Sequence, residues 1–209
     1  MTAPRLTLAS QSPARLATLR AAGLDPVVDV SGVDESTAAA TAPDALAVEL
    51  ACLKARTVAE RTPDGLVVGC DSVLDFGGEV LGKPGTAEEA RRRWRAMRGG
   101  SGVLHTGHCV IDVSTGREVC RGADTVVHFA DITDAEIEAY VATGEPLGVA
   151  GAFTIDGLGG AFVTGIEGDP HTVVGISLPL LREMLADLGV LWHDLWTGRS
   201  ATAAAGEGA

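Results

Sequence analysis

LVVGCDSVLDF, residues 66–76, decides the fold because it is typical of a strand in the middle of a sheet. Its apolar run is continuous rather than alternating, which indicates that both faces of the strand are covered. One carboxylate, Asp71, interrupts the run, and the hydroxyl of Ser72 follows it. A carboxylate inside an apolar strand is costly unless it is paired or binds a metal ion. By this stretch alone, Asp71 is a structural ion-pair partner or a functional residue with about equal weight.

Helices and strands alternate on both sides of this strand. Upstream, the pattern predicts strands at Arg5–Ala9 and Pro26–Val30 and helices from Pro13 to Gly23 and from Pro43 to Arg61. The mixture predicts an α/β protein with a partly antiparallel sheet. Downstream we expect a hairpin turn at Gly77-Gly78, a helix that begins at a Thr86/Glu89 capping box, β-rich segments at 102–113 and 118–130, a helix that begins at a Thr133/Glu136 capping box, a loop with one short strand over 148–168, and a helix over Ser177–Leu188.

Length, composition and charge restrict the class of protein. The chain has 209 residues, of which 46% are apolar, so it can bury a core and is not disordered. We expect one domain over residues 1–196 and a small, polar tail over 197–209. The formal net charge of −12 disfavours binding to a nucleic acid polymer, but a few local cations are enough to hold a small phosphorylated ligand.

Cysteine spacing and apolar runs indicate the compartment. The four cysteines, Cys52, Cys70, Cys109 and Cys120, include no C-x-x-C pair, so the spacing gives no support for zinc or redox use and predicts reduced core thiols. No apolar run reaches membrane-spanning length, and the first residues lack the apolar stretch of a signal peptide. We therefore expect a cytoplasmic protein that does not associate with a membrane.

The first candidate for an anion site is the segment Ser10-Gln11-Ser12-Pro13-Ala14-Arg15. A strand followed by a serine-capped helix presents free backbone N–H groups, and the helix dipole favours an anion there. Arg15 lies in the first helical turn, where a cation opposes the dipole but can fork onto a phosphate. The alternative is an ordinary capped helix with an exposed arginine, which this segment alone favours.

Further charged residues are weaker candidates when each is taken singly. Asp34 and Glu35 follow the second predicted strand and can bind a divalent cation, but taken alone they are better explained by a solvated turn. Lys54 lies one position off the apolar stripe of its helix, and Lys83 lies between Gly82 and Pro84. Both lysines can be solvated, or they can supply positive charge for a triphosphate together with Arg15.

Two other patterns give little support for a site. His105 and His108 are three residues apart in a predicted strand, where they face opposite sides, so zinc binding there is not expected. The glycine-rich loop 157–160 does not fit a P-loop or a dinucleotide fingerprint.

Taken together and in this order, the segments resemble the Maf family of nucleoside triphosphate pyrophosphatases. Each match is weak, but together they extend over roughly nine-tenths of the chain at intervals like those of the family. The matching segments are LASQSPAR at 8–15, VDES at 33–36, LACLKA at 50–55, GCDSV at 69–73, LGKP at 81–84, HTGH at 105–108, AYVATGEP at 139–146, AGAFTIDGLGGAFV at 150–163 and IEGDPHTVVGISL at 166–178.

The resemblance implies an elongated α/β fold like that of Maf and ITPase proteins, with a mixed, curved sheet flanked by helices and a cleft between two lobes. It implies hydrolysis of a nucleoside triphosphate to the monophosphate and pyrophosphate, with Mg²⁺ or Mn²⁺ as cofactor, and commonly a homodimer. Carried onto this chain, it makes Asp71 the catalytic base and a metal ligand, and Glu35 a second metal ligand. The phosphate-holding set falls on Arg15, Lys54 and Lys83, with Ser10, Ser12 and Ser72 beside them.

Three positions depart from the family pattern. Ala14 stands where members often have a second basic residue, and Ser72 stands where a threonine is usual. Asp156 stands where the pyrimidine-preferring branch has glutamine. An amide both donates and accepts hydrogen bonds at a base edge, whereas a carboxylate only accepts. The base therefore stays open between a pyrimidine, a modified nucleotide such as 7-methyl-GTP, and a broad range.

A second hypothesis is a nucleotide-binding regulator with little turnover, because family members have been associated with septum formation. The loss of a basic residue at Ala14 gives it mild support, whereas Asp71, Glu35 and Lys83 favour turnover.

Overall fold

The computed structural model describes residues 4–197 of the chain. One seven-stranded sheet has the order β2-β1-β3-β5-β6-β7, and β4 pairs with the far part of β3. β1 is parallel to both of its neighbours, and all the other pairs are antiparallel. The strands are β1 (Leu6–Leu8), β2 (Val27–Val28), β3 (Leu66–Phe76), β4 (Glu79–Leu81), β5 (Ser101–Asp112), β6 (Arg117–Phe129) and β7 (Val163–Glu167).

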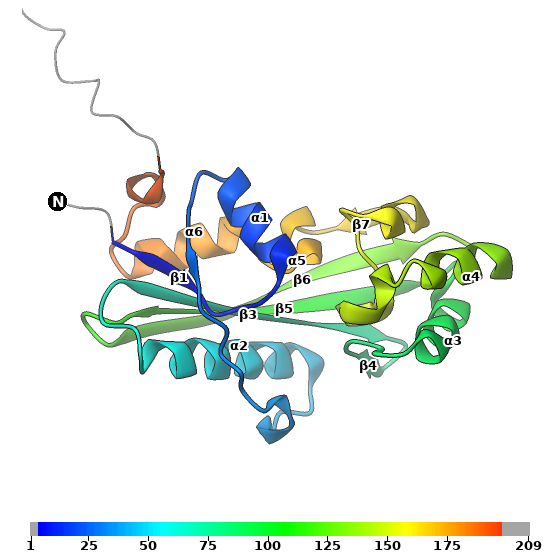
Figure 1. The fold of residues 1–209 in the computed structure, drawn as a ribbon, viewed down its shortest axis with the longest axis horizontal. Helices are drawn as coiled ribbons and strands as arrows, with labels where there is room; N and C mark the ends of the chain where they lie inside the picture. The colour runs from blue at the N-terminus through cyan, green and yellow to red at the C-terminus, as the bar shows by residue number, and fades with distance from the viewer. Residues whose placement is uncertain (1–3, 198–209) are drawn as a thin grey trace, which may run out of the picture.

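Helices cover both faces of this sheet (Figure 1). α2 lies along one face of β3 and β5, whereas α1, α5 and α6 lie on the opposite face, and α3 and α4 pack at the far end of the long strands. The helices are α1 (Pro13–Ala21), α2 (Pro43–Ala59), α3 (Ala87–Met97), α4 (Asp134–Ala142), α5 (Pro170–Val174) and α6 (Leu178–Asp187), and the 3₁₀ turns are η1 (Glu35–Thr37), η2 (Glu145–Gly148), η3 (Ala150–Ala152), η4 (Leu158–Phe162) and η5 (Trp192–Leu195).

The predicted central strand is confirmed. β3 pairs with β5 from Leu66 to Asp75, and its first eight residues other than Ser72 are buried. Both faces of the strand contribute to apolar cores, since Val67 packs beneath α2 and Val68 packs beneath α1 and α6. The α/β class with a mixed sheet follows directly from this arrangement.

α2 approaches the sheet unusually closely because glycines of the two central strands lie directly under its backbone. A Cβ atom added to Gly107 would lie 2.1 Å from the carbonyl oxygen of Ala47, and one added to Gly69 would lie 2.3 Å from that of Ala51. The side chains of Ala47, Ala51 and Ala55 are fully buried at this contact. The absence of a side chain at Gly69 and at Gly107 therefore sets the height of α2 above the sheet.

An aromatic cluster forms a second core at the far end of the sheet. Trp94 of α3 is fully buried, and its ring makes edge contacts with Phe129, Tyr140 and Phe162, with centroids 5.6–5.8 Å apart. Its indole N–H donates to the carbonyl of Ala152 at 2.8 Å, so its one polar group is satisfied. Edge-to-face pairs of this kind add to the energy of burial, and they join α3, α4 and the segment before β7 into one unit.

Several predicted elements end differently in the structure. The strand predicted over Pro26–Val30 is reduced to the two residues of β2, and the helix predicted to reach Arg61 ends at Ala59. Of the two predicted capping boxes, the one at Thr133 and Glu136 is complete. The Thr86/Glu89 prediction is half right, because Thr86 caps α3 whereas the carboxylate of Glu89 binds arginines of the same helix.

The sequence analysis missed α5, which Asp169 caps and Gly175 ends. Its five residues are too few to show a helical period. Of the predicted tail, only Thr197 lies within the described residues, so the predicted domain boundary stays a prediction. Among residues 4–197, no helix is long and apolar enough to cross a membrane.

His108 joins β5 to the start of α6. The backbone N–H of Ser177 donates to its Nε2 at 2.8 Å, so the proton lies on Nδ1, which faces the carbonyl of Thr106 at 3.1 Å. Burial, followed by the nearby charge of Arg15, lowers the pKa of His108 to about 4. The side chain is therefore neutral at physiological pH and serves as a satisfied core residue. His105 points to the other face of β5, as the alternation predicts, where its half-buried ring lies 2.7 Å from the carboxylate of Asp124.

The close approach of α2 predicts a large effect of one methyl group. Gly107→Ala should lower the free energy of unfolding by about 3 kcal/mol, because its Cβ meets backbone that cannot move without lifting the helix. The matched control is Gly122→Ala in the neighbouring strand, where the nearest atom is a methyl of Val48 at 3.4 Å; its effect should stay within about 0.5 kcal/mol. Urea denaturation measures both, and equal effects would contradict the packing argument.

The neutral His108 predicts a pH dependence of stability. Its folded pKa lies below its unfolded value, so the unfolded chain binds the proton first, and stability is lost as the pH falls from about 6.5 toward 4. Between pH 7.5 and 5.0 the loss from this residue should be roughly 2 kcal/mol. His108→Gln, which keeps one donor and one acceptor, should lose correspondingly less over the same interval in denaturant titrations. Identical pH profiles for the two proteins would show that His108 is not the source.

Candidate functional site

The candidate site lies at a gap in one edge of β3. β1 pairs with this edge from Leu66 as far as Val68, and β4 begins to pair with it at Leu74. The last contact on the β1 side is the hydrogen bond from the N–H of Ala9 to the carbonyl of Val68, and beyond it the chain turns away into α1. The stretch of β3 between these two partners therefore faces a loop and side chains instead of another strand, and it contains Asp71 and Ser72.

Lys54 joins the two acidic residues that the sequence singled out. Its Nζ lies 2.5 Å from Oδ1 of Asp71 and 2.7 Å from Oε1 of Glu35. The side chains of Lys54 and Asp71 are only 12% and 13% exposed, whereas that of Glu35 is 54% exposed. The buried carboxylate of the central strand is thus paired, and the pair opens toward solvent on the side of Glu35.

The pKa of Glu35 reports how close the basic residues lie to its carboxylate. Burial tends to raise the pKa of its carboxyl, but the hydrogen bond and charge of Lys54, with the charges of Lys83 and Arg15, hold that pKa below its usual range. Glu35 is therefore ionised at neutral pH. Three cations from three separate segments converge on one carboxylate, although the protein as a whole is strongly acidic.

Arg15 is held rigidly on the other side of Asp71. Its Nε donates to the carbonyl of Gly175 at 2.8 Å, and its two terminal nitrogens reach the hydroxyls of Ser10 and Ser72 at 3.2 Å each. Ser12 caps α1 by accepting from the backbone N–H of Arg15 at 3.3 Å, as the sequence indicated. No ion pair within residues 4–197 uses this guanidinium, so its charge remains available to an anion.

Thr106 is a polar neighbour of the site that the sequence analysis did not single out. It lies opposite Ser72 across the β3–β5 pair, and the two hydroxyls are 2.9 Å apart. Its own hydroxyl donates to the carbonyl of Thr172, which ties the site to α5. Only the strand register brings Thr106 here, although it lies inside the HTGH segment that the resemblance had marked.

Two of the predicted site residues are not fixed by contacts. Lys83 is exposed just beyond β4, and its charge reaches Glu35. Asp156 is exposed between η3 and η4, and none of the hydrogen bonds or ion pairs among residues 4–197 involves its side chain. The glycine-rich loop beside it is organised by Glu145, which accepts from the N–H groups of Leu158 and Gly159 at 3.0 Å each.

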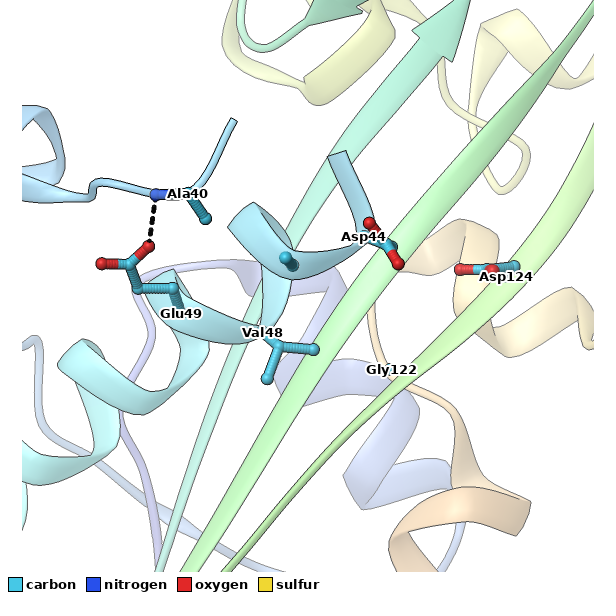
Figure 2. A pocket seen from close by; sticks show the side chains of 7 residues that line it. Ala40, Asp44, Val48, Glu49, Gly122 and Asp124 are labelled. Carbon is cyan, nitrogen blue, oxygen red and sulfur yellow. Dashed lines mark hydrogen bonds between the residues drawn. The ribbon is translucent and has the colours of Figure 1, made fainter. Parts of the chain in front are cut away.

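A hollow of about 640 Å³ lies elsewhere, between the start of α2 and β6 (Figure 2). Its lining includes Asp44, Glu49 and Asp124 but no lysine or arginine, and Glu49 accepts from the N–H of Ala40 at 2.8 Å. Such a lining repels a polyphosphate, whereas the gap in β3 presents cations. By its charges, the gap is therefore a more favourable place for a phosphate than this hollow.

The arrangement at the gap suits attack on a phosphate. Cations hold and neutralise phosphate oxygens, and a carboxylate such as Asp71 can accept a proton from water. The two carboxylates that meet at Lys54 also offer the oxygen ligands that Mg²⁺ and Mn²⁺ prefer.

Comparisons with known proteins find relatives along nearly the whole chain. Residues 5–188 match the model of the family described as Maf-like protein. A protein of Salinispora tropica named nucleoside triphosphate pyrophosphatase is 58% identical over 203 residues, which cover 95% of this chain and 90% of that protein. One of Streptomyces coelicolor with the same name is 59% identical over 194 residues, covering 92% and 94%.

A third protein with that name, from Cutibacterium acnes, is 57% identical over 200 residues and covers 91% and 94% of the two chains. The solved structure of the Ham1 protein of Staphylococcus aureus covers 92% of this chain and 93% of its own, but at 12% identity and a TM-score of 0.47 the likeness is too low to argue from. The family match and the high identity of the relatives agree over nearly the whole length, and this chain therefore belongs to the Maf-like protein family.

Proposed function

We propose that this protein hydrolyses a nucleoside triphosphate to the monophosphate and pyrophosphate. One observation carries the proposal: at the open edge of β3, the Lys54 ammonium joins Asp71 to Glu35, and Arg15 lies beside them with its charge uncompensated. The names of the relatives support the same reaction. A buried acid, a second acid and converging cations are what cleavage of a phosphoanhydride requires.

Substrate binding falls to the basic residues and to the start of α1. Arg15 is pre-positioned by Ser10, Ser72 and the carbonyl of Gly175, so it loses little freedom when it binds a phosphate. The hydroxyls of Ser10 and Ser12 and the N-terminal N–H groups of α1 lie next to it. Lys83 adds a further positive charge, near enough to help lower the pKa of Glu35. These groups hold the phosphate chain across the gap.

The residues present fit a divalent cation such as Mg²⁺ or Mn²⁺. One carboxylate oxygen of Glu35 and one of Asp71 meet at the Lys54 ammonium, at 2.7 and 2.5 Å, so the two acids lie close enough together to share an ion. We propose that these two carboxylates hold the cation, and that Lys54 then turns to the phosphates. When bound, such a cation supplies positive charge that neutralises the phosphate oxygens.

Asp71 is the proposed general base. It is nearly buried, and its backbone is held in the middle of the β3–β5 pair, opposite Gly107. A water molecule beside it therefore meets a carboxylate of fixed position. Proton transfer to Asp71 accompanies attack of the water on the α-phosphorus, the bond to the bridging oxygen breaks, and pyrophosphate leaves. Arg15 and Lys83 stabilise the charge that develops on the leaving pyrophosphate.

The sharpest test removes the base and keeps the shape. Asp71→Asn should lower kcat by about 10²- to 10⁴-fold, because the amide cannot accept the proton. Pyrophosphate release is measured with Mg²⁺ or Mn²⁺ across the standard ribo- and deoxyribonucleoside triphosphates, 7-methyl-GTP and modified uridine triphosphates. Asp75→Asn, on the same strand four residues further along, is the matched control and should retain activity. Orthophosphate as the product, or a fully active Asp71→Asn protein, would contradict the proposal.

The second candidate, a nucleotide-binding regulator, is separated by the same variant. Asp71→Asn keeps Arg15, Lys83 and the serines, so nucleotide binding measured by calorimetry should persist while turnover disappears. If the wild-type protein binds nucleotides tightly and turns over none of the panel, the regulator is the better description. A cellular effect that persists undiminished in Asp71→Asn would lie outside the enzymatic activity.

Asp156 is the proposed contact to the base. It is exposed at the glycine-rich loop, where its carboxylate can only accept hydrogen bonds. Asp156→Gln adds a donor, so the ratio of kcat/KM for pyrimidine over purine triphosphates should change by about tenfold or more. Asp64→Asn, at an exposed bend between α2 and β3, is the control and should leave the ratio unchanged. An unchanged ratio in Asp156→Gln would remove this residue from base recognition.

We also propose a homodimer that acts in the cytoplasm, on the family resemblance. Sedimentation of the purified protein and fractionation of the source cells would test the two parts separately. A monomer across the working concentration range would refute the first, and recovery outside the cytoplasmic fraction would refute the second.

A further inference from the structure

Three of the four cysteines meet on the face of the sheet that α2 covers. Cys109 of β5 and Cys120 of β6 are direct cross-strand partners, so their side chains lie on the same face. Cys52 of α2 packs with both in one cluster, and Cys109 is fully buried. The fourth cysteine, Cys70, lies in the core on the opposite face of β3.

A carboxylate completes this group. Glu118 lies two residues before Cys120 and therefore on the same face, and the Cys120 thiol donates to its Oε1 at 3.0 Å. One ligand atom from each of Cys52, Cys109, Cys120 and Glu118 lies within 4.8 Å of all the others. Three sulfurs and one oxygen thus surround a single point between α2 and the β5–β6 pair.

These separations are close to those of a tetrahedral metal site. Thiolate sulfurs at about 2.3 Å from zinc lie about 3.8 Å apart in a tetrahedron. To reach that spacing from separations of up to 4.8 Å, the ligand atoms need to move inward by no more than roughly 1 Å. Rotamer changes supply movements of that size. Cys120 and Glu118 are not fully buried, so an ion can enter from solvent.

The surrounding charge also suits a cation. Arg56 lies one turn after Cys52 on α2, and its Nη2 and Nε contact the two oxygens of Glu118 at 2.7 and 3.0 Å. Three thiolates and a carboxylate would carry four negative charges, of which a divalent cation offsets two and Arg56 a third.

We infer that Cys52, Cys109, Cys120 and Glu118 form a site for a thiophilic divalent cation of the zinc class. Sulfur ligands select such ions over Mg²⁺ and Mn²⁺, which prefer oxygen. This site is therefore chemically separate from the carboxylate pair at Lys54. A bound ion would fasten α2 to β5 and β6, two residues before Lys54 in the chain, and so would stabilise the helix that presents this lysine.

Cobalt binding tests the ligands directly, because Co²⁺ bound by thiolates in a tetrahedral site absorbs strongly in the near ultraviolet and visible. The full chain, reduced and freed of metal, should bind one equivalent of Co²⁺ with these bands, and zinc should displace it. Cys120→Ser should abolish or weaken the bands. Cys70→Ala removes a thiol outside the group and should keep them. Absence of the bands in the wild-type protein, or equal bands in Cys120→Ser, would overturn the inference.

Thermal unfolding provides a second readout that does not depend on activity. Zinc at about 100-fold above its dissociation constant should raise the wild-type Tm by roughly 5–10 °C. The shift should disappear in Cys120→Ser and remain in Cys70→Ala, and Mg²⁺ should not reproduce it through these thiols. An equal zinc shift in the wild type and in Cys120→Ser would place the ion elsewhere and would overturn the assignment even if both variants fold well.

Discussion

The contact on which the rest of the structure depends is the packing of α2 directly against β3 and β5. At Gly69 and Gly107 the sheet has no side chains, and the helix backbone fills their space. Because of this close approach, the side chain of Lys54 reaches Asp71 at the edge of the helix instead of pointing into solvent. Two groups of side chains lie between α2 and the sheet as a result. One is the ion pair of Lys54, and the other is the cluster of three thiols.

The site is a product of incomplete strand pairing. β1 covers one part of the edge of β3 and β4 covers another, and Asp71 and Ser72 fall between them on opposite faces of the strand. One face supplies the acid with its lysine, and the other supplies a hydroxyl held by Arg15. An anion at this edge can therefore meet groups from both faces of the sheet. Local cations make the position attractive to a phosphate in spite of the net charge of −12.

The two proposed cation sites differ in the type of ligand that each offers. Oxygen ligands meet at Lys54, close to solvent, where the proposed hard ion would exchange together with the nucleotide. Sulfur ligands meet beneath α2, where a softer ion would remain and stabilise the fold. Gly69 and Asp71 are two residues apart on β3, and their β5 partners are Cys109 and Gly107, so adjacent positions of one sheet face carry the two groups.

The sequence by itself determined the α/β class, the central strand, most helices and the identities of the charged candidates, because periodicity, caps and short motifs act between residues close in the chain. Its errors concerned the details of single elements. The strand at β2 was predicted too long, and the Thr86/Glu89 capping box is incomplete because neighbouring arginines bind Glu89. Only the tertiary structure decided that Lys54 bridges Glu35 and Asp71, that Thr106 faces Ser72, and that three cysteines without motif spacing converge. Those contacts depend on strand register and on the height of α2 above the sheet, which no local pattern specifies.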